Sequence, residues 1–368
     1  MRTPLLLLIL PLLICIANID SLQAQENKQL FVFAKHQILP GYGFRKMSHP
    51  EIFQGNNKRK KYFEGWYFKM VSSDGTSILS IIPGIALSPN GKEQHAFIQI
   101  IDGKSAKTNY YPFPIEEFKF SKKDFAIQIG HNFFSKDKII LDIHTDSAVV
   151  RGEITMSRQV GFSSPKILNP GIMGWYRFVP FMQCYHGVVS LTHDLEGNLV
   201  KDGKIYDFNG GIGYLEKDWG RSMPSAWIWI QSNNFIHSHG SFMLSVANVP
   251  WLGKPFTGFL GFFLYDSTLV RFATYTHAKL HLDESISDTT KITINDRKHS
   301  LSIAVTRNNS GLLRAPVKGS MDRRIAESID AKLRLAVRDR KGNIIFNDST
   351  SIAGFEKVGN QEILTGKH

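Results

Sequence analysis

The sequence predicts an all-β protein made of two antiparallel β-barrel or sandwich halves packed together, with few short helices. Short runs of β-branched and aromatic residues recur about every ten residues, which is typical of antiparallel barrels and sandwiches. Turn signals such as Asp74-Gly75, Asn90-Gly91 and Asp102-Gly103 separate these runs. A segment rich in Gly, Pro and Ser, from Val160 to Gly174, divides two β-rich parts of the chain. This division predicts two similar halves.

The individual strands follow from aromatic and β-branched content at period 2. Before the connector we expect strands at 62–71, 78–82, 95–102, 125–129, 139–144 and 149–156. After it we expect a strand beginning at 185, and then strands at 241–249, 256–265, 269–282, 292–295, 301–306, 331–337 and 343–346. Residues 323–329 are predicted to form one helical turn.

The N-terminal residues 1–24 have the pattern of a secretory signal peptide. Arg2 precedes an apolar run from Leu5 to Ile19, and small residues ending at Ala24 give a plausible cleavage site. An uncleaved anchor is the alternative. The sequence thus predicts an exported protein, periplasmic or membrane-associated, with an N-terminal domain at 25–190 (connector about 160–180) and a C-terminal domain at 191–368.

The formal net charge of +12 favours an anionic partner surface. For an exported chain without a nucleic-acid motif, we expect lipid headgroups and peripheral membrane association, and no nucleic acid. The basic run Lys58–Lys61 is either a solvated loop or a membrane-facing patch. Cleavage of the signal peptide would leave one cysteine, Cys184, for which a buried, inert position is favoured over a nucleophilic role.

Several sequence motifs of catalysis are missing. The chain has no HExxH, CxxC or GxSxG motif and no Walker loop. We therefore predict neither a metal nor a cofactor. What stands out is the stretch from Gly203 to Phe235, which combines three of the six tryptophans with the charged triplet Glu216-Lys217-Asp218. Acids among aromatic residues need either a partner or a chemical role.

As a strand, this stretch would place Tyr214, Glu216 and Asp218 on one face, and Lys217 and Trp219 on the other. Two carboxylates on one buried face repel each other, which would raise the pKa of at least one of them. A carboxylic acid kept neutral in this way can act as a general acid. The alternative is a structural salt bridge from Glu216 or Asp218 to Arg221 or to a core arginine.

Two further patterns point toward a cavity lined with aromatic rings. Trp227 and Trp229 share a face and could be plain core, or a pocket wall that holds an isoprenoid and stabilises a carbocation. In the strand at 62–71, Glu64 falls on the same face as Trp66. That placement indicates either a buried ion pair or a polar group directed into a cavity.

Motifs separated along the chain resemble the tocopherol cyclase family. They are FEGWYF at 63–68, HAFIQIID at 95–102, EKDWG at 216–220, WIWIQSN at 227–233, and a closing pattern around Met321, Glu327-Ser328 and Ala353–Glu356. The resemblance covers roughly residues 40–360. The chain also resembles, more distantly, the carotenoid hydratases. In those proteins a Tyr-x-acid pair and an upstream His are associated with protonation of a double bond.

This resemblance implies two lipocalin-like β-halves and a redox-neutral cyclisation of a prenylated hydroquinone to a chromanol. It implies Glu216 as the general acid, with Asp218 second and Glu64 third, Tyr214 as the partner of Glu216, and His186 as the upstream His. The expected substrate contacts are Trp66, Tyr67, Trp219, Trp227, Trp229, Gln231 and Asn233. The expected partner is a prenylated quinol or another isoprenoid lipid. The alternatives are a non-catalytic prenyl-lipid-binding protein and a terpenoid hydratase or isomerase.

Overall fold

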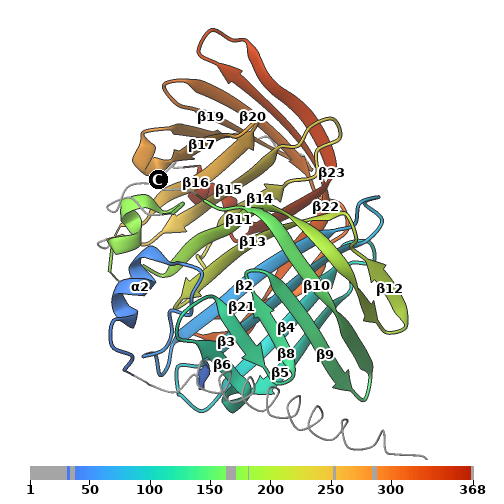
Figure 1. The fold of residues 1–368 in the computed structure, drawn as a ribbon. Helices are drawn as coiled ribbons and strands as arrows, with labels where there is room; N and C mark the ends of the chain where they lie inside the picture. The colour runs from blue at the N-terminus through green and yellow to red at the C-terminus, as the bar shows by residue number, and fades with distance from the viewer. Residues whose placement is uncertain are drawn as a thin grey trace, which may run out of the picture.

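The computed structural model describes residues 31–33, 38–162, 171–180, 182–251, 254–283 and 288–365. The predicted signal peptide at 1–24 lies outside these residues. Within them the chain forms two large antiparallel sheets, one composed of blue to green strands and the other of yellow to red strands (Figure 1). The prediction of an all-β protein with two lipocalin-like antiparallel halves and few short helices is confirmed.

The first sheet has the strand order β1-β6-β7-β8-β9-β10-β11-β13-β2-β3-β4-β5, with β12 paired to β11. Its strands are β1 (Phe31–Phe33), β2 (Tyr62–Val71), β3 (Ile78–Leu87), β4 (Gln94–Asp102), β5 (Thr108–Pro114), β6 (Phe118–Ser121), β7 (Ala126–Ile129), β8 (Asn132–Ser135), β9 (Lys138–Thr145), β10 (Ala148–Val160), β11 (Cys184–Lys201), β12 (Lys204–Asp207) and β13 (Gly211–Gly220).

The second sheet has the order β17-β16-β15-β14-β23-β22-β20-β19-β18, with β21 paired to β22. Its strands are β14 (Trp227–Ser232), β15 (Ser241–Val249), β16 (Phe256–Tyr265), β17 (Thr268–Ala273), β18 (Lys279–Leu282), β19 (Thr289–Asn295), β20 (His299–Thr306), β21 (Gly311–Val317), β22 (Ser320–Asp339) and β23 (Ile344–Val358). The described helices are α2 (Tyr42–Ser48), η1 (Ile115–Glu117), η2 (Gly174–Phe178), η3 (Thr274–Thr276) and η4 (Gln361–Leu364).

The chain crosses from the first sheet to the second between Gly220 and Trp227. The expected domain boundary at 190/191 instead falls inside β11. Because β11 pairs with β10 on one side and with β13 on the other, it is an internal strand of the first sheet. The Gly- and Pro-rich connector therefore marks an interruption within the first sheet and not the passage between the sheets.

Two expected elements differ in the structure. The helical turn predicted at 323–329 is part of the long strand β22, in which buried side chains alternate with more exposed ones except at 327–331, where every residue is buried. Pairing with β21 and β23 supplies the backbone hydrogen bonds that a single helical turn would leave unmade. The strand predicted at 269–282 is divided into β17 and β18 by η3, after which His277 adopts a left-handed backbone conformation with φ of 61°.

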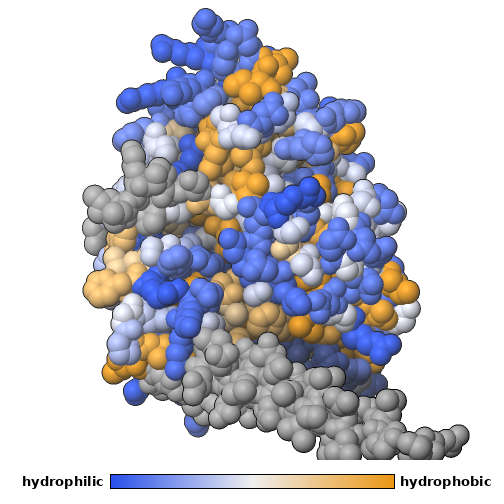
Figure 2. Space-filling model, in the orientation of Figure 1, coloured by the Kyte–Doolittle hydropathy of each residue, from blue (hydrophilic) through white to orange (hydrophobic). Residues whose placement is uncertain are grey.

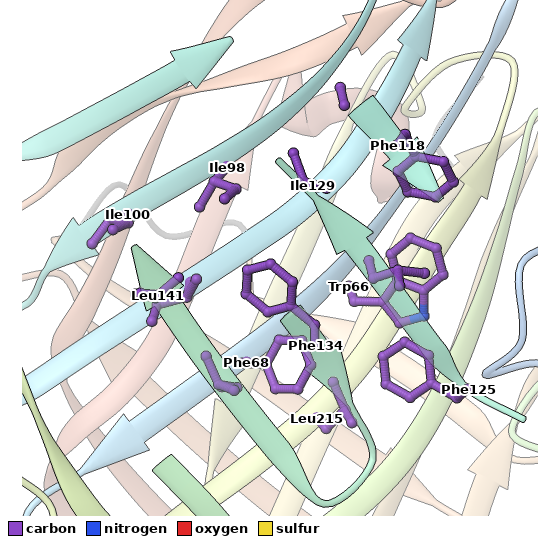
Figure 3. Close-up of a cluster of buried hydrophobic side chains, with 14 of the residues drawn as sticks. Trp66, Phe68, Ile98, Ile100, Phe118, Phe125, Ile129, Phe134, Leu141 and Leu215 are labelled. Atoms are coloured by element: carbon purple, nitrogen blue, oxygen red, sulfur yellow. The ribbon is translucent and has the colours of Figure 1, made fainter. Parts of the chain in front are cut away.

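The described residues form four buried hydrophobic clusters, of which three are large. The first lies within the first sheet and contains Trp66, Phe68, Phe118 and Phe134 (Figure 3). The second belongs to the second sheet, and the third combines residues of both sheets, including Tyr214 and Trp229. Strands β13 and β14 are consequently buried on both faces. This explains why their sequences read as nearly continuous apolar and aromatic runs.

On the surface, hydrophilic residues lie between hydrophobic ones, and the hydrophobic residues gather mainly along the second sheet in the view of Figure 2. The basic run Lys58–Lys61 is exposed in the turn that precedes β2. Its interpretation as a membrane-facing patch stays a prediction. Among the described residues, no helix has the length and apolar character needed to cross a membrane.

Candidate active site between the two sheets

Strand pairing in the first sheet gathers the predicted acid residues on one wall. In β13, Tyr214, Glu216 and Asp218 alternate with Lys217 and Trp219, as the sequence predicts. Asp218 lies directly opposite His186 of β11 in the strand register. Since both strands are central in the sheet, these side chains have no open edge beside them and face the second sheet.

His186 bridges the two acids. Its Nδ1 lies 2.9 Å from Asp218 Oδ1, and its Nε2 lies 3.5 Å from Glu216 Oε2. Burial lowers the pKa of this imidazole, but the two carboxyl groups and the hydrogen bond to Asp218 together raise it to about 9. His186 therefore carries a positive charge at neutral pH and acts as the counter-ion of the acids. The predicted salt bridge to Arg221 or a core arginine is replaced by this histidine.

Glu216 is nearly inaccessible, with 6% of its side chain exposed. The Tyr214 hydroxyl donates a hydrogen bond of 2.7 Å to Glu216 Oε2, and Trp229 Nε1 donates one of 3.3 Å to the same oxygen. Burial raises the pKa of Glu216, His186 opposes that rise, and the result is about 7. Glu216 can therefore hold a proton near neutral pH and release it into a site where three polar groups stabilise the resulting carboxylate.

A second pair of acids, which is not among the site residues predicted from the sequence, lies on the second sheet. Glu327 of β22 and Glu356 of β23 are directly opposite each other in the strand register. The Tyr67 hydroxyl donates to Glu327 Oε1 at 2.5 Å, and Trp227 Nε1 donates to Glu356 Oε2. Burial raises the pKa of Glu327 well above its ordinary value and that of Glu356 to about 7.

Two cavities meet at these acids. The first has a volume of about 120 Å³ and is lined by His186, Trp227 and many apolar side chains that include Met173, Met182, Phe256, Phe259 and Leu260. The second has a volume of about 100 Å³ and is lined by Tyr67, Gln99, Glu216, Arg314 and Glu327. Asp218, Met223, Trp229 and Glu356 line both cavities. The site thus combines an apolar space with a polar one.

Three of the predicted site residues lie elsewhere. Glu64 forms a fully buried ion pair of 2.5 Å with Lys217 on the opposite face of β13. Trp66 stacks on Phe125 inside the first sheet (Figure 3), and Trp219 stacks on Tyr185. None of the three predicted residues lines either cavity. The reason is the alternation of side chains: in β2 it is Tyr67, and not Glu64 or Trp66, that faces the cavities.

Gln231 and Asn233 also lie away from both cavities. They join the sheets instead. Lys69 Nζ of β2 donates to Gln231 Oε1 at 3.1 Å, and Asn233 Nδ2 donates to the carbonyl oxygen of Gly213 at 2.8 Å. These bonds, with those from Tyr67 to Glu327 and from Trp229 to Glu216, hold the two walls of the site in register.

The residues next to Glu327 and Glu356 in the sequence do not indicate that these two acids belong to the site. Glu327 falls in the segment predicted as a helical turn, and a helical period hides the period-2 alternation that turns it inward. Glu356 follows Ala353, Gly354 and Phe355, a pattern noted only as part of a motif. Only the pairing of β22 with β23 shows that these two acids, 29 residues apart in the chain (356 minus 327), are neighbours.

His186, Glu216 and Asp218 present donor atoms within 4.8 Å of one another, an arrangement that a metal ion could also use. However, Glu216 Oε2 already accepts hydrogen bonds from Tyr214 and Trp229, and His186 Nδ1 pairs with Asp218. Because these donor atoms are already engaged in hydrogen bonds with one another and with Tyr214 and Trp229, the arrangement fits proton transfer better than metal coordination. Cys184 lines the first cavity, and burial raises the pKa of its thiol well above the ordinary value, so it is not a ready nucleophile.

Comparison with known proteins relates this chain to plant enzymes. The tocopherol cyclase of Zea mays chloroplasts is 24% identical over 243 residues, which cover 63% of this chain and 51% of that protein. A probable chloroplastic tocopherol cyclase of Oryza sativa subsp. japonica is 24% identical over 247 residues, with the same coverage. The chain spans about half the length of the curated relatives it matches.

Among solved structures, CghA in complex with Sch210972 has a TM-score of 0.53 at 8% identity, covering 88% of this chain and 94% of that one. That likeness concerns the fold alone. Residues 138–360, more than half of the chain, match the model of the family described as tocopherol cyclase-like. The match begins after the motifs at 63–68 and 95–102, and includes β11, β13, β14, β22 and β23, from which most of the site is built. The chain belongs to the tocopherol cyclase-like family.

Proposed function

We propose that this protein is an enzyme that closes a chroman ring by protonating a double bond of a prenylated hydroquinone, without change of oxidation state. The observation that carries the proposal is a buried carboxyl group, Glu216, which accepts hydrogen bonds from Tyr214 and Trp229 and lines a cavity. Burial raises its pKa to about 7, in keeping with a proton donor. Membership of the tocopherol cyclase-like family supports an enzyme of the cyclase or hydratase type.

The reaction needs one proton delivered to carbon. Both hydrogen bonds to Glu216 reach Oε2, so Oε1 is the oxygen that would carry the acidic proton. The π electrons of the double bond take this proton and leave a tertiary cation. Tyr214, Trp229 and His186 then stabilise the Glu216 carboxylate. The indole rings of Trp227 and Trp229 line the first cavity, and their π electrons can stabilise a nearby cation.

The two cavities suit the two parts of a prenylated quinol. The apolar cavity, with its methionine and phenylalanine side chains, fits an isoprenoid tail. The cavity lined by Tyr67, Gln99 and Arg314 offers hydrogen-bonding groups for the quinol ring. Glu216 lines this second cavity, so a quinol ring bound there would bring the double bond closest to the ring near the acid. The phenol oxygen of the same molecule is then the nearest group that can capture the cation.

The mass of the product tests this proposal. Purified protein incubated anaerobically with a prenylated hydroquinone should yield a chromanol of unchanged mass, and chelation of divalent metals should not reduce the yield. A product heavier by one water molecule would identify a hydratase. Prenyl lipid recovered unchanged after long incubation, while bound to the protein, would identify a lipid-binding protein.

The pH dependence follows from the same carboxyl group. Because Glu216 must be protonated to act and its pKa is about 7, kcat/KM should fall about tenfold per pH unit as the pH rises above 7. His186 remains charged over this range, since its pKa is about 9. A kcat/KM that stays constant or rises between pH 7.5 and pH 8.5 would contradict the assignment of Glu216 as the acid.

A further inference from the structure

We infer that Glu327 and Glu356 form a second catalytic unit, in which the pair shares one proton and Glu356 accepts the phenol proton as the chroman ring closes. This inference rests on the proposed function, since it assigns the base for the same reaction. Cyclisation both consumes and releases a proton, and the acid site on the first sheet supplies only the first of these steps. The second carboxyl pair stands on the opposite wall of the same cavity.

The two acids of the second sheet differ in burial: Glu327 is buried, and Glu356 is partly exposed to the cavities. Glu327 is 1% exposed, and its Oε1 accepts the hydrogen bond from Tyr67, whose hydroxyl in turn accepts one from Ser80 at 2.8 Å. Glu356 is only half-buried and lines both cavities. The same arrangement occurs on the first sheet, where Glu216 is buried against Tyr214 and Asp218 reaches both cavities.

The placement of the two acids assigns the shared proton to Glu327. Strand pairing sets the two carboxyl groups opposite each other, and two carboxylates this close in a buried site repel, so the pair is most stable when one of them holds a proton. Glu327 Oε2 is buried and has no hydrogen-bond partner, so it is the oxygen on which that proton can sit. Glu356 accepts from Trp227 and is the carboxylate that faces the cavity.

The charged groups around the pair are unevenly distributed. Glu216 and Asp218 face it from β13; when ionised, both raise the pKa of Glu356, and Glu216 also raises that of Glu327. Arg307 and Arg323 interact electrostatically with Glu356, and Lys69 interacts with Glu327. Among the described residues, no Lys or Arg nitrogen lies within 4.0 Å of either carboxyl group in an ion pair. The pair is thus held by a shared proton and not by a counter-ion.

The proton balance of the reaction then closes. The Glu216 O–H bond breaks as the new C–H bond forms from the π electrons. The phenol O–H bond breaks, an electron pair of the phenol oxygen forms the C–O bond, and the proton moves to the Glu356 carboxylate. The substrate is isomerised, Glu216 ends as a carboxylate and Glu356 as an acid. Release of one proton to solvent and uptake of another restore the starting state, without any oxidant or reductant.

Deuterium exchange separates the two proton transfers. In D₂O, wild-type protein should convert the prenylated hydroquinone to chromanol. Glu356→Gln should still exchange deuterium into the recovered substrate, because Glu216 protonates the double bond and the cation loses a proton again. Its rate of chromanol formation should fall roughly 100-fold or more. Glu196→Gln, an exposed acid of β11, is the matched control and should behave as wild type.

A second variant tests the shared proton without any catalysis. Gln resembles a protonated Glu and cannot ionise. Glu327→Gln should therefore raise the melting temperature at pH 9 relative to wild type, and raise it less at pH 5, where the native pair already holds its proton. An equal change at both pH values would overturn the shared proton.

The outcomes distinguish this inference from the proposed function. If the wild type makes no chromanol, the proposed function fails. If the wild type makes it and Glu356→Gln makes it equally fast, only the assignment of Glu356 as the base fails. If Glu356→Gln folds with wild-type stability but loses both deuterium exchange and cyclisation, the pair belongs to alkene protonation, and its role as the base is likewise overturned.

Discussion

Glu216→Gln is expected to reduce kcat for chromanol formation by roughly 100- to 10,000-fold, the range over which positioned general acids contribute to catalysis. The amide keeps the shape of the carboxyl group and can still accept the hydrogen bonds from Tyr214 and Trp229. It cannot deliver an acidic proton to the double bond. Steady-state kinetics with a prenylated hydroquinone would measure the loss, with substrate binding checked separately by fluorescence of Trp229 and its neighbours.

Two comparisons make this experiment specific. Glu196→Gln changes an exposed acid and should retain full activity. Asp218→Asn keeps an acceptor for His186 Nδ1 but removes its negative charge, and it should have a smaller effect than Glu216→Gln, because Asp218 is assigned to position the imidazolium and Glu216 to donate the proton. If Glu216→Gln and Asp218→Asn both kept wild-type activity, the acid would have to be sought elsewhere.

Lys217→Met should destabilise the protein by about 3–5 kcal/mol, because it leaves the Glu64 carboxylate buried without its counter-charge. Both side chains are 0% exposed, and Lys217 also donates to the carbonyl oxygens of Pro50 and Ile52. Burial lowers the pKa of Lys217 to about 8, although Glu64 opposes the shift. Since small proteins are stable by about 5–15 kcal/mol in total, the change should move the denaturation midpoint strongly.

Two controls distinguish a buried charge from a lost contact. The double variant Glu64→Gln/Lys217→Met removes both charges and should recover part of the stability lost by the single variant. Lys138→Met breaks an exposed ion pair with Glu153 and should cost about 1 kcal/mol or less. Equal losses for Lys217→Met and Lys138→Met would show that the pair between Glu64 and Lys217 is not a structural support of β13.

The all-β class could be predicted because it depends on local patterns. Alternating apolar residues and Asp-Gly or Asn-Gly turns report strand and hairpin formation within a few residues. The crossing point between the sheets depends on long-range pairing instead. The residues of β11 do not reveal that this strand pairs with both β10 and β13. The predicted domain boundary at 190/191 therefore falls inside β11, whereas the chain passes between the sheets after Gly220.

The candidate site shows the same contrast. Side chains alternate between the two faces of a strand, and this alternation alone predicts that Tyr214, Glu216 and Asp218 share one face of β13 while Lys217 lies on the other. It could not show which face of β2 meets the cavity, so Glu64 and Trp66 were expected there although Tyr67 occupies that place. Glu327 and Glu356 become a pair only when β22 and β23 align, which no spacing in the sequence reveals.

Deuterium content of the product tests the central claim most directly. Wild-type protein incubated in D₂O with a prenylated hydroquinone should form a chromanol that carries one deuterium on carbon, at the position of the former double bond, because the solvent-exchanged Glu216 carboxyl group supplies that atom. A chromanol without deuterium on carbon, formed at the same rate, would contradict proton transfer from an acidic side chain as the first step of the reaction.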